Sequence, residues 1–316
     1  MFDTVAEDVP FAFACLATTD PANGLINAAY KSHPLPVGDQ EFAASEYGGP
    51  DINQFVELAG RQPPVGLLSV DTGGEPMLCR RLREYMAPQF GFTDELRLVC
   101  RGPQLTWGLL ALYRAGGEPS FTPADGRLVA SLHEAISDGV RRVLFAGHPS
   151  PIAGAGTPVV MVLDGEDRVT DMSTATDTVI EELGGWDHGS LPASAMMVAA
   201  SSRSLRAPAE AQVPASSGRW FKVRAMPLGE GPTGAAVVLT IERADPAVVG
   251  QMAIAARGLT VREQEVVALV LQGASTKDIA SRLYLSPHTV QDHLKAIFAK
   301  LEVSSRRELV GQFILT

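Results

Sequence analysis

Residues 286–301 carry the polar side chains whose types and spacing are best suited to binding a partner molecule. Val290, Leu294 and Ile297 recur at helical spacing, which predicts a helix that begins at Ser286-Pro287 and has one apolar face. The opposite face is polar and partly basic: His288, Thr289, Gln291, Asp292, His293, Lys295 and Lys300. A helix of this kind, about 20 Å long, fits the major groove of DNA. Hydrogen bonding to base edges is the chemistry that the pattern predicts.

Capping signals predict three further helices around this one. Thr260 and Glu263 form a capping box, Ser275 begins a second helix with Asp278 in its first turn, and Ser305 begins the last. Four helices with short turns make a small bundle, in which the second and third have helix-turn-helix proportions.

Charge alone does not decide whether this bundle binds nucleic acid. Residues 258–316 contain seven Lys/Arg and six Asp/Glu, a net charge of +1 in a chain whose net charge is −10. The acidity belongs to the first 257 residues. A bundle whose polar face is merely solvated stays an alternative on this ground.

Three runs of this region closely resemble the LuxR-type (NarL/FixJ, GerE-like) DNA-binding domain. They are Gly258–Val267, Ser275–Leu283 and Leu285–Lys295, within a match of about 58 residues. The resemblance implies that 275–294 is the helix-turn-helix and that helix 287–300 is the recognition helix. Gln291-Asp292 departs from the commoner pattern, so the operator sequence cannot be transferred from relatives.

The same resemblance implies individual roles. Base-edge contacts are implied for Gln291, Asp292 and Lys295, with His288 on the same face. Phosphate contacts are implied for Thr276, Lys277, Thr289 and Lys300, while packing or a phosphate contact is expected of His293. The last helix would pair two subunits through Leu309, Val310 and Phe313.

Several classes of protein are excluded by composition. No apolar run reaches the ~18 residues of a membrane span, and the N-terminus lacks the basic start of a signal peptide. We therefore expect a cytoplasmic protein without membrane contact. Cys15, Cys79 and Cys100 are too widely spaced for a zinc site, and no phosphate-binding loop or nucleophile elbow occurs. We expect no metal, no cofactor and no enzymatic activity.

Turn and linker signals divide the rest of the chain. A mixed region at 9–147 is followed by Pro/Gly/Ala-rich residues 147–156, an α+β module at 155–244 and a linker at 245–257. In the first region the patterns predict strands at 11–18, 25–31, 95–101 and 107–114, and helices at 52–60, at 76–86 and over about 20 residues from Thr122. The module is predicted as strand–strand–helix–helix–strand–strand. The predicted fold class is multidomain α+β, followed by an all-α four-helix domain at 258–316.

The two α+β regions resemble sensor domains. Residues 94–99, 107–114 and 121–125 look like the strand pair and last helix of a GAF domain, and 159–169 like the opening of a PAS domain. Both resemblances imply a small-molecule or protein sensor. Met86, Phe90, Trp107 and Tyr113 are candidates to line a ligand cavity, with core packing as the alternative.

Together these patterns predict a ligand-responsive regulator that binds double-stranded DNA as a homodimer. A small-molecule effector would act on the sensor regions, and RNA polymerase would be a further partner if the protein is an activator. Two alternatives stay open, a sigma-like promoter-recognition factor and an enzyme in the GAF/PAS-like region with a DNA-binding tail.

Overall fold

The computed structural model describes residues 2–37, 39–102, 105–145, 157–229 and 236–314, with side chains as far as Gly311. The predicted linker at 147–156 lies outside the described residues. The chain forms two compact units. The first holds Met1–Val140, Thr157–Ser217 and Phe221–Arg243, and the second holds Arg141–Gly156, Gly218–Trp220 and Ala244–Thr316.

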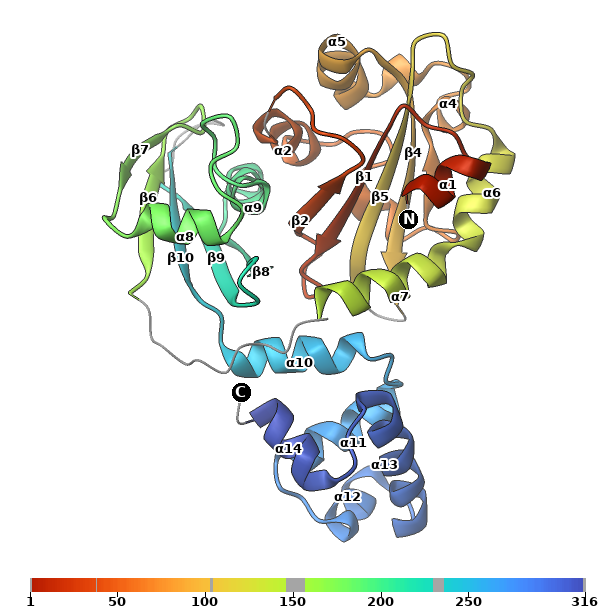
Figure 1. The fold of residues 1–316 in the computed structure, drawn as a ribbon, viewed down its shortest axis with the longest axis vertical. Coiled ribbons are helices and arrows are strands. Elements are labelled where there is room, and N and C mark those ends of the chain that lie inside the picture. Colours follow the sequence, from red (N-terminus) through yellow and green to blue (C-terminus); the bar gives the residue numbers. More distant parts are fainter. Residues whose placement is uncertain (1, 38, 103–104, 146–156, 230–235, 315–316) are drawn as a thin grey trace. The chain divides into compact units, whose positions relative to one another are not determined.

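The first unit contains two five-stranded sheets (Figure 1). The first sheet has the order β2-β1-β5-β4-β3. Its strands are β1 (Phe13–Thr19), β2 (Ile26–Lys31), β3 (Val65–Leu67), β4 (Phe92–Arg101) and β5 (Thr106–Ala115), with α1 (Phe2–Asp8) ahead of them. The four strands predicted for this region are present, and β3 was not expected. All pairs in this sheet are antiparallel.

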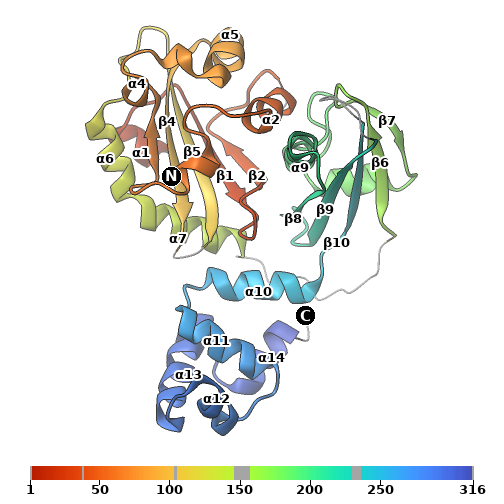
Figure 2. The ribbon, with the colours of Figure 1, turned by 180° about the vertical axis from the view of Figure 1, so that it is seen from behind.

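One face of this sheet is covered by α6 (Pro123–Ser131) and α7 (His133–Leu144), as Figures 1 and 2 show. Thr122 and Asp125 form the capping box that opens α6. The prediction of a single long helix from Thr122 is wrong, because the helix is interrupted at Leu132. The Leu132 N–H bonds to the carbonyl of Val129 rather than to residue 128, which tightens the last turn of α6.

Shorter helices replace two that the sequence predicted. Only α3 (Phe55–Leu58) forms within 52–60, and 76–86 divides into a 3₁₀ turn, η1 (Pro76–Leu78), and a π-helical turn, η2 (Leu82–Met86). The Asp51 carboxylate accepts hydrogen bonds from the backbone N–H groups of Arg80 (2.9 Å) and Arg81 (2.8 Å). This side chain satisfies donors that a continuous helix would otherwise use. The neighbouring helices are α2 (Gln40–Tyr47), α4 (Leu68–Asp71) and α5 (Ala87–Phe90).

The second sheet has the order β7-β6-β10-β9-β8. Its strands are β6 (Val159–Leu163), β7 (Val169–Met172), β8 (Ala209–Pro214), β9 (Trp220–Pro227) and β10 (Val237–Arg243), with α8 (Thr176–Glu182) and α9 (Ala193–Leu205) between β7 and β8. The sequence did not predict β8, because Ala, Glu and Gln are poor strand formers. Gln212 in β8 donates its backbone N–H to Asp20 (2.7 Å) and accepts from the Asn27 amide at its carbonyl (2.8 Å). Long-range contacts therefore stabilise this strand.

The second unit is helical. Residues 245–257, predicted as a linker, instead contain α10 (Pro246–Ala256), because the Asp245 side chain caps Ala247 N–H at 2.8 Å and Pro246 occupies the first helical position. It is followed by α11 (Val261–Leu271), α12 (Thr276–Leu283), α13 (Pro287–Leu301) and α14 (Arg306–Ile314). These four match the predicted helices, and α12 lies beside α13 in both views (Figures 1 and 2). None of the described helices is both long and apolar enough to cross a membrane.

Candidate functional site

Helix α13 has the two faces that its sequence predicts. Val290 and Ile297 are fully buried against α11 and α12. On the opposite side, Gln291 is exposed, and the side chains of His288 and Lys295 are 85% and 79% exposed. Since exposed positions 288, 291, 292 and 295 are spaced by three or four residues, they form one row along the helix.

The turn before α13 sets the direction of this row. Tyr284 ends α12 in the left-handed conformation (φ 54°), and Leu285 N–H then bonds to the carbonyl of Ala280 at 2.9 Å. The Ser286 hydroxyl caps α13 by accepting from Thr289 N–H at 3.0 Å. Tyr284 is 96% exposed at the turn before α13 and was not among the predicted site residues.

Ion pairs organise the exposed row. The Asp292 carboxylate lies 3.0 Å from His288 Nδ1 and 3.7 Å from Lys295 Nζ. All three side chains are largely solvated, so these pairs contribute little to stability. They hold an acceptor between two donors, which is the mixture of groups that base edges can use.

The start of α12 offers a second contact region. Ser275 and Asp278 form a capping box there, Lys277 is exposed and Thr276 is half-buried. Free N–H groups and the helix dipole favour an anion at such an end. The Thr289 and His293 side chains on α13 are half-buried, and Thr289 Oγ1 lies 2.9 Å from the Ser286 hydroxyl.

Two predicted contacts are engaged inside the domain. Lys300 Nζ lies 2.6 Å from Glu263 Oε2 and also donates to the carbonyl of Gly258. Lys300 therefore fixes α13 to the start of α11 instead of presenting a free charge. Leu309 is fully buried in the domain, where α14 packs on α10 and α11, so it offers no surface to a second subunit. Val310 is half-buried, and the Phe313 side chain lies outside the described residues.

The Glu263–Lys300 pair predicts an acid sensitivity of the helical domain. Burial alone would raise the pKa of Glu263, but hydrogen bonds from Lys300 and Thr260 lower it below its ordinary value. A lowered carboxylate pKa adds stability above its unfolded value, about 4.3, and this stability is lost as the pH falls through the folded pKa. We expect Glu263→Gln to destabilise α11–α13 by roughly 1 kcal/mol at neutral pH and to weaken the acid dependence below pH ~4. Hydrogen exchange of α11–α13 at neutral pH and below pH ~4 measures both effects. An acid dependence that is the same in the variant and the native chain would contradict the prediction.

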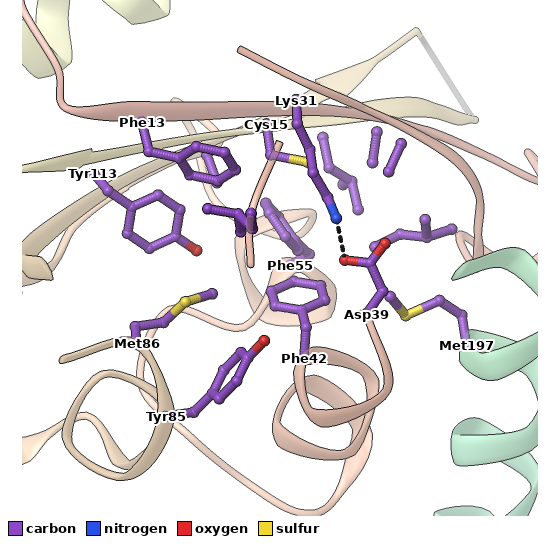
Figure 3. Close-up of a pocket in the computed structure, with 16 residues that line it drawn as sticks. Phe13, Cys15, Lys31, Asp39, Phe42, Phe55, Tyr85, Met86, Tyr113 and Met197 are labelled. Atoms are coloured by element: carbon purple, nitrogen blue, oxygen red, sulfur yellow. Dashed lines mark ion pairs between the residues drawn. The ribbon is translucent and has the colours of Figure 1, made fainter. Parts of the chain in front are cut away.

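The first sheet borders a cavity of about 540 Å³, counting the space at its mouth (Figure 3). Its wall uses alternate residues of three strands: Phe13, Cys15 and Ala17 in β1, Ala29 and Lys31 in β2, and Leu109, Ala111 and Tyr113 in β5. Residues two apart on a strand share a face, so this sheet face is the floor of the cavity. Phe42 of α2, Phe55 of α3 and Met197 of α9 add to the lining. Its other residues are Ile26, Leu35, Asp39, Tyr85 and Met86.

The four predicted cavity residues divide evenly. Met86 and Tyr113 line the cavity. Trp107 is buried beyond its lining, and Phe90 packs edge-on against Tyr85 at 5.5 Å. The lining residues of β1 and β2 were missed, although the period-two pattern of Phe13, Cys15 and Ala17 was available as a signal.

A buried network of charges lies beside the cavity. Arg97 Nη1 is 2.9 Å from Glu46 and its Nε is 2.8 Å from Glu95, while Arg81 reaches Glu95 at 2.5 Å and Asp51 at 3.4 Å. The Arg97 guanidinium also covers the Phe55 ring at 4.1 Å. Burial would raise the pKa of Glu95, but the two arginines lower it to about 2.

No group of three or more His, Cys, Asp or Glu side chains among the described residues could hold a metal ion. The three cysteines are free thiols, and burial raises the pKa of Cys15 to about 12.

Comparison with known proteins identifies the helical domain. Residues 257–312 match the family described as bacterial regulatory proteins, luxR family. The spore germination protein GerE of Bacillus subtilis is 41% identical over 56 residues, which are 18% of this chain and 76% of GerE. The monoamine regulon transcriptional regulator of Klebsiella aerogenes is 52% identical over 54 residues, 17% of this chain and 24% of that protein. The family description and the name of the Klebsiella protein both refer to regulation, in agreement with the DNA-binding regulator that the sequence predicts.

Similarity outside the helical domain is weak. A Mycobacterium tuberculosis protein described as an HTH-type transcriptional regulator is 54% identical over 54 residues, which are 17% of this chain but only 6% of that protein. Escherichia coli SdiA aligns over 100% of this chain and 87% of its own, with 12% identity and a TM-score of 0.32. A score this low does not establish a shared fold.

Proposed function

The chain belongs, through residues 257–312, to the luxR family of bacterial regulatory proteins, and we propose that it binds double-stranded DNA with α13 in the major groove. The observation that carries this proposal is the row of exposed polar side chains at 288, 291, 292 and 295, opposite a fully buried face. Lys295 and Gln291 would read base edges, and Lys277 would neutralise a phosphate at the start of α12.

Two copies of the domain would act together. With a net charge of +1 on residues 258–316, one copy has little electrostatic attraction for DNA. Pairing on half-sites one helical turn apart multiplies the contacts. Because Leu309 is buried, the pairing surface would use the exposed side of α14 instead. RNA polymerase would be a further partner of an activator.

Lys295→Ala tests the assignment of α13. The side chain is 79% exposed and its ion pair with Asp292 is weak, so the fold should not change. Specific operator affinity should fall by roughly 1–3 kcal/mol, because a base-edge contact is lost. Footprinting, followed by titration of the protected sequence at fixed salt, measures both the site and its affinity. Two protected half-sites on one face of the duplex would support pairing.

Matched substitutions separate base contacts from general charge effects. Lys277→Ala should weaken binding to all sequences similarly and reduce the salt dependence by about one ion. Arg127→Ala on α6 removes an exposed charge outside the helical domain and should have little effect. Equal losses for Lys295→Ala and Arg127→Ala would contradict the recognition-helix assignment, and the absence of any footprint would contradict the proposed function.

The first unit would supply the signal. We propose that the first sheet with its helices is a GAF-like sensor and the second a PAS-like one. Two features support a ligand-responsive role, the cavity on the first sheet and its closure by Met197 of α9, which packs on α2 and β2. A ligand in the cavity would contact the modules of both sheets. It would shift the equilibrium between conformations of these modules toward the one that binds it better.

A further inference from the structure

We infer that the cavity on the first sheet binds a neutral, largely apolar molecule that carries one amide-type group, and that it excludes carboxylates. The inference deepens the proposed sensor function and rests on it. It depends on the shape of the lining, on the pairing of its charged groups and on the phenol hydroxyls that face the interior.

The lining is mainly aromatic and aliphatic. Phe13, Phe42 and Phe55 present rings to the cavity (Figure 3). Leu109 and Ala111 of β5 also line it. Phe13 also packs on Tyr113, with ring centroids 5.8 Å apart, so these two lining rings support each other. Binding energy would come mostly from burial of an apolar body against these groups.

The charged groups of the lining cancel each other. Lys31 Nζ lies 2.9 Å from Asp39 Oδ1, and the two side chains are only 21% and 16% exposed. A carboxylate that approached Lys31 would meet Asp39 at the same place. A neutral amide has an acceptor oxygen for Lys31 and an N–H donor for Asp39, so it can bind both without leaving a charge uncompensated.

Negative charge dominates around the cavity. The neighbouring network holds two arginines, Arg81 and Arg97, against three carboxylates, Glu46, Asp51 and Glu95. The net negative charge of this network would therefore repel an anionic ligand in addition to the repulsion by Asp39.

Two phenols supply the remaining polar atoms. The hydroxyls of Tyr85 and Tyr113 are directed toward the interior of the cavity in Figure 3. Burial raises the pKa of both, with added contributions from the charges of Glu41 and Asp39 at Tyr85 and of Glu95 at Tyr113. Both hydroxyls stay protonated at neutral pH. The Tyr113 hydroxyl is hydrogen-bonded to Glu95, so the Tyr85 hydroxyl is the donor left for a carbonyl oxygen of the ligand.

The test uses the full chain and pairs of probes that differ only in the head group. A series of phenylalkanamides is compared with the phenylalkanoates of the same chain lengths by saturation-transfer NMR titration at neutral pH. We expect the amides to bind and the carboxylates to bind at least roughly tenfold more weakly. Binding of the carboxylates as tightly as the amides, or of neither series, would overturn the inference.

Two variants locate the binding and test its cause. Asp39→Asn removes the anion but keeps the side-chain shape, and Asp39 makes no side-chain capping bond to α2 whose loss could unfold the helix. This variant should bind the carboxylates roughly fivefold to tenfold more tightly than the native chain does, because Lys31 is then unopposed. An unchanged preference would show that the Lys31–Asp39 pair has only a structural role.

Tyr85→Phe removes one inward hydroxyl with almost no change of volume. It should weaken the amides roughly threefold to tenfold. Tyr30→Phe on β2 is the matched control, since Tyr30 is 47% exposed and does not line the cavity. Equal effects of the two variants would count against the site.

Footprinting of the same samples separates this inference from the proposed function. If the chain binds the amides but protects no DNA, the ligand site is supported and the proposed regulator function is contradicted. If the chain protects an operator but binds no amide, only the ligand site is contradicted.

Discussion

Replacement of Arg97 by alanine is expected to lower the free energy of unfolding of the first sheet by about 3–5 kcal/mol. Its guanidinium is fully buried and contacts Glu46 at 2.9 Å and Glu95 at 2.8 Å. Without it, three buried carboxylates, Glu46, Asp51 and Glu95, would share Arg81 alone. The Phe55 ring would also lose the cation that covers it at 4.1 Å.

Acid should act on the same network. The pKa of Glu95 is lowered to about 2, so its contribution to stability is complete above the unfolded value of about 4.3 and is lost as the pH falls toward 2. Arg97→Ala should reduce this dependence, because one of the two lowering charges is gone.

Hydrogen exchange of the β4 and β5 amides is the appropriate measurement, because a chain with two units does not unfold in one step. Arg83→Ala is the control. Arg83 pairs with Glu84 at 2.8 Å, but the side chains are 49% and 56% exposed, so we expect a change below about 0.5 kcal/mol. Similar losses in both variants would mean that the buried pairs contribute no more than solvated ones.

Replacement of Ile297 by alanine is expected to cost the helical domain about 2–5 kcal/mol. Ile297 is fully buried on α13, in the same stripe as Val290 and Leu301. Truncation leaves a space among side chains from α11 and α12, which cannot close without moving the capped helix starts. A loss of this size is a large part of the stability of a small domain.

DNA binding should therefore fall for a different reason than in Lys295→Ala. Ile297→Ala would lose operator affinity together with hydrogen-exchange protection of α11–α13, whereas Lys295→Ala would lose affinity with protection unchanged. Cooling should partly restore binding by Ile297→Ala only. Full protection in the Ile297 variant would contradict its place in the core.

Local signals predicted the helical domain well. The capping boxes at Thr260 and Ser275 and the serine caps at Ser286 and Ser305 are present, and each helix begins where its cap indicates. Caps and a period of 3.6 involve residues at most a few positions apart, so a short window contains them. The polar row on α13 followed from the same periodicity.

Other features differ from the sequence predictions. Residues 245–257, expected as a linker, contain α10, although Asp245 and Pro246 are a local helix-start signal. Lys300, predicted at a phosphate, also pairs with Glu263, 37 positions earlier, a contact that the sequence did not indicate. Leu309 was expected at an interface, but α10 and α11 bury it.

The sequence by itself therefore determined the helix-turn-helix, the exposed polar face of α13 and the presence of strands and helices ahead of it. The tertiary structure decided which side chains meet. Tyr85, Lys31 and Met197 belong to three separate stretches of the chain, and only the pairing of β1 with β2 and β5 and the packing of α9 bring them to one cavity. Strand register and helix packing arise from contacts between residues far apart in the chain, which local periodicity does not specify.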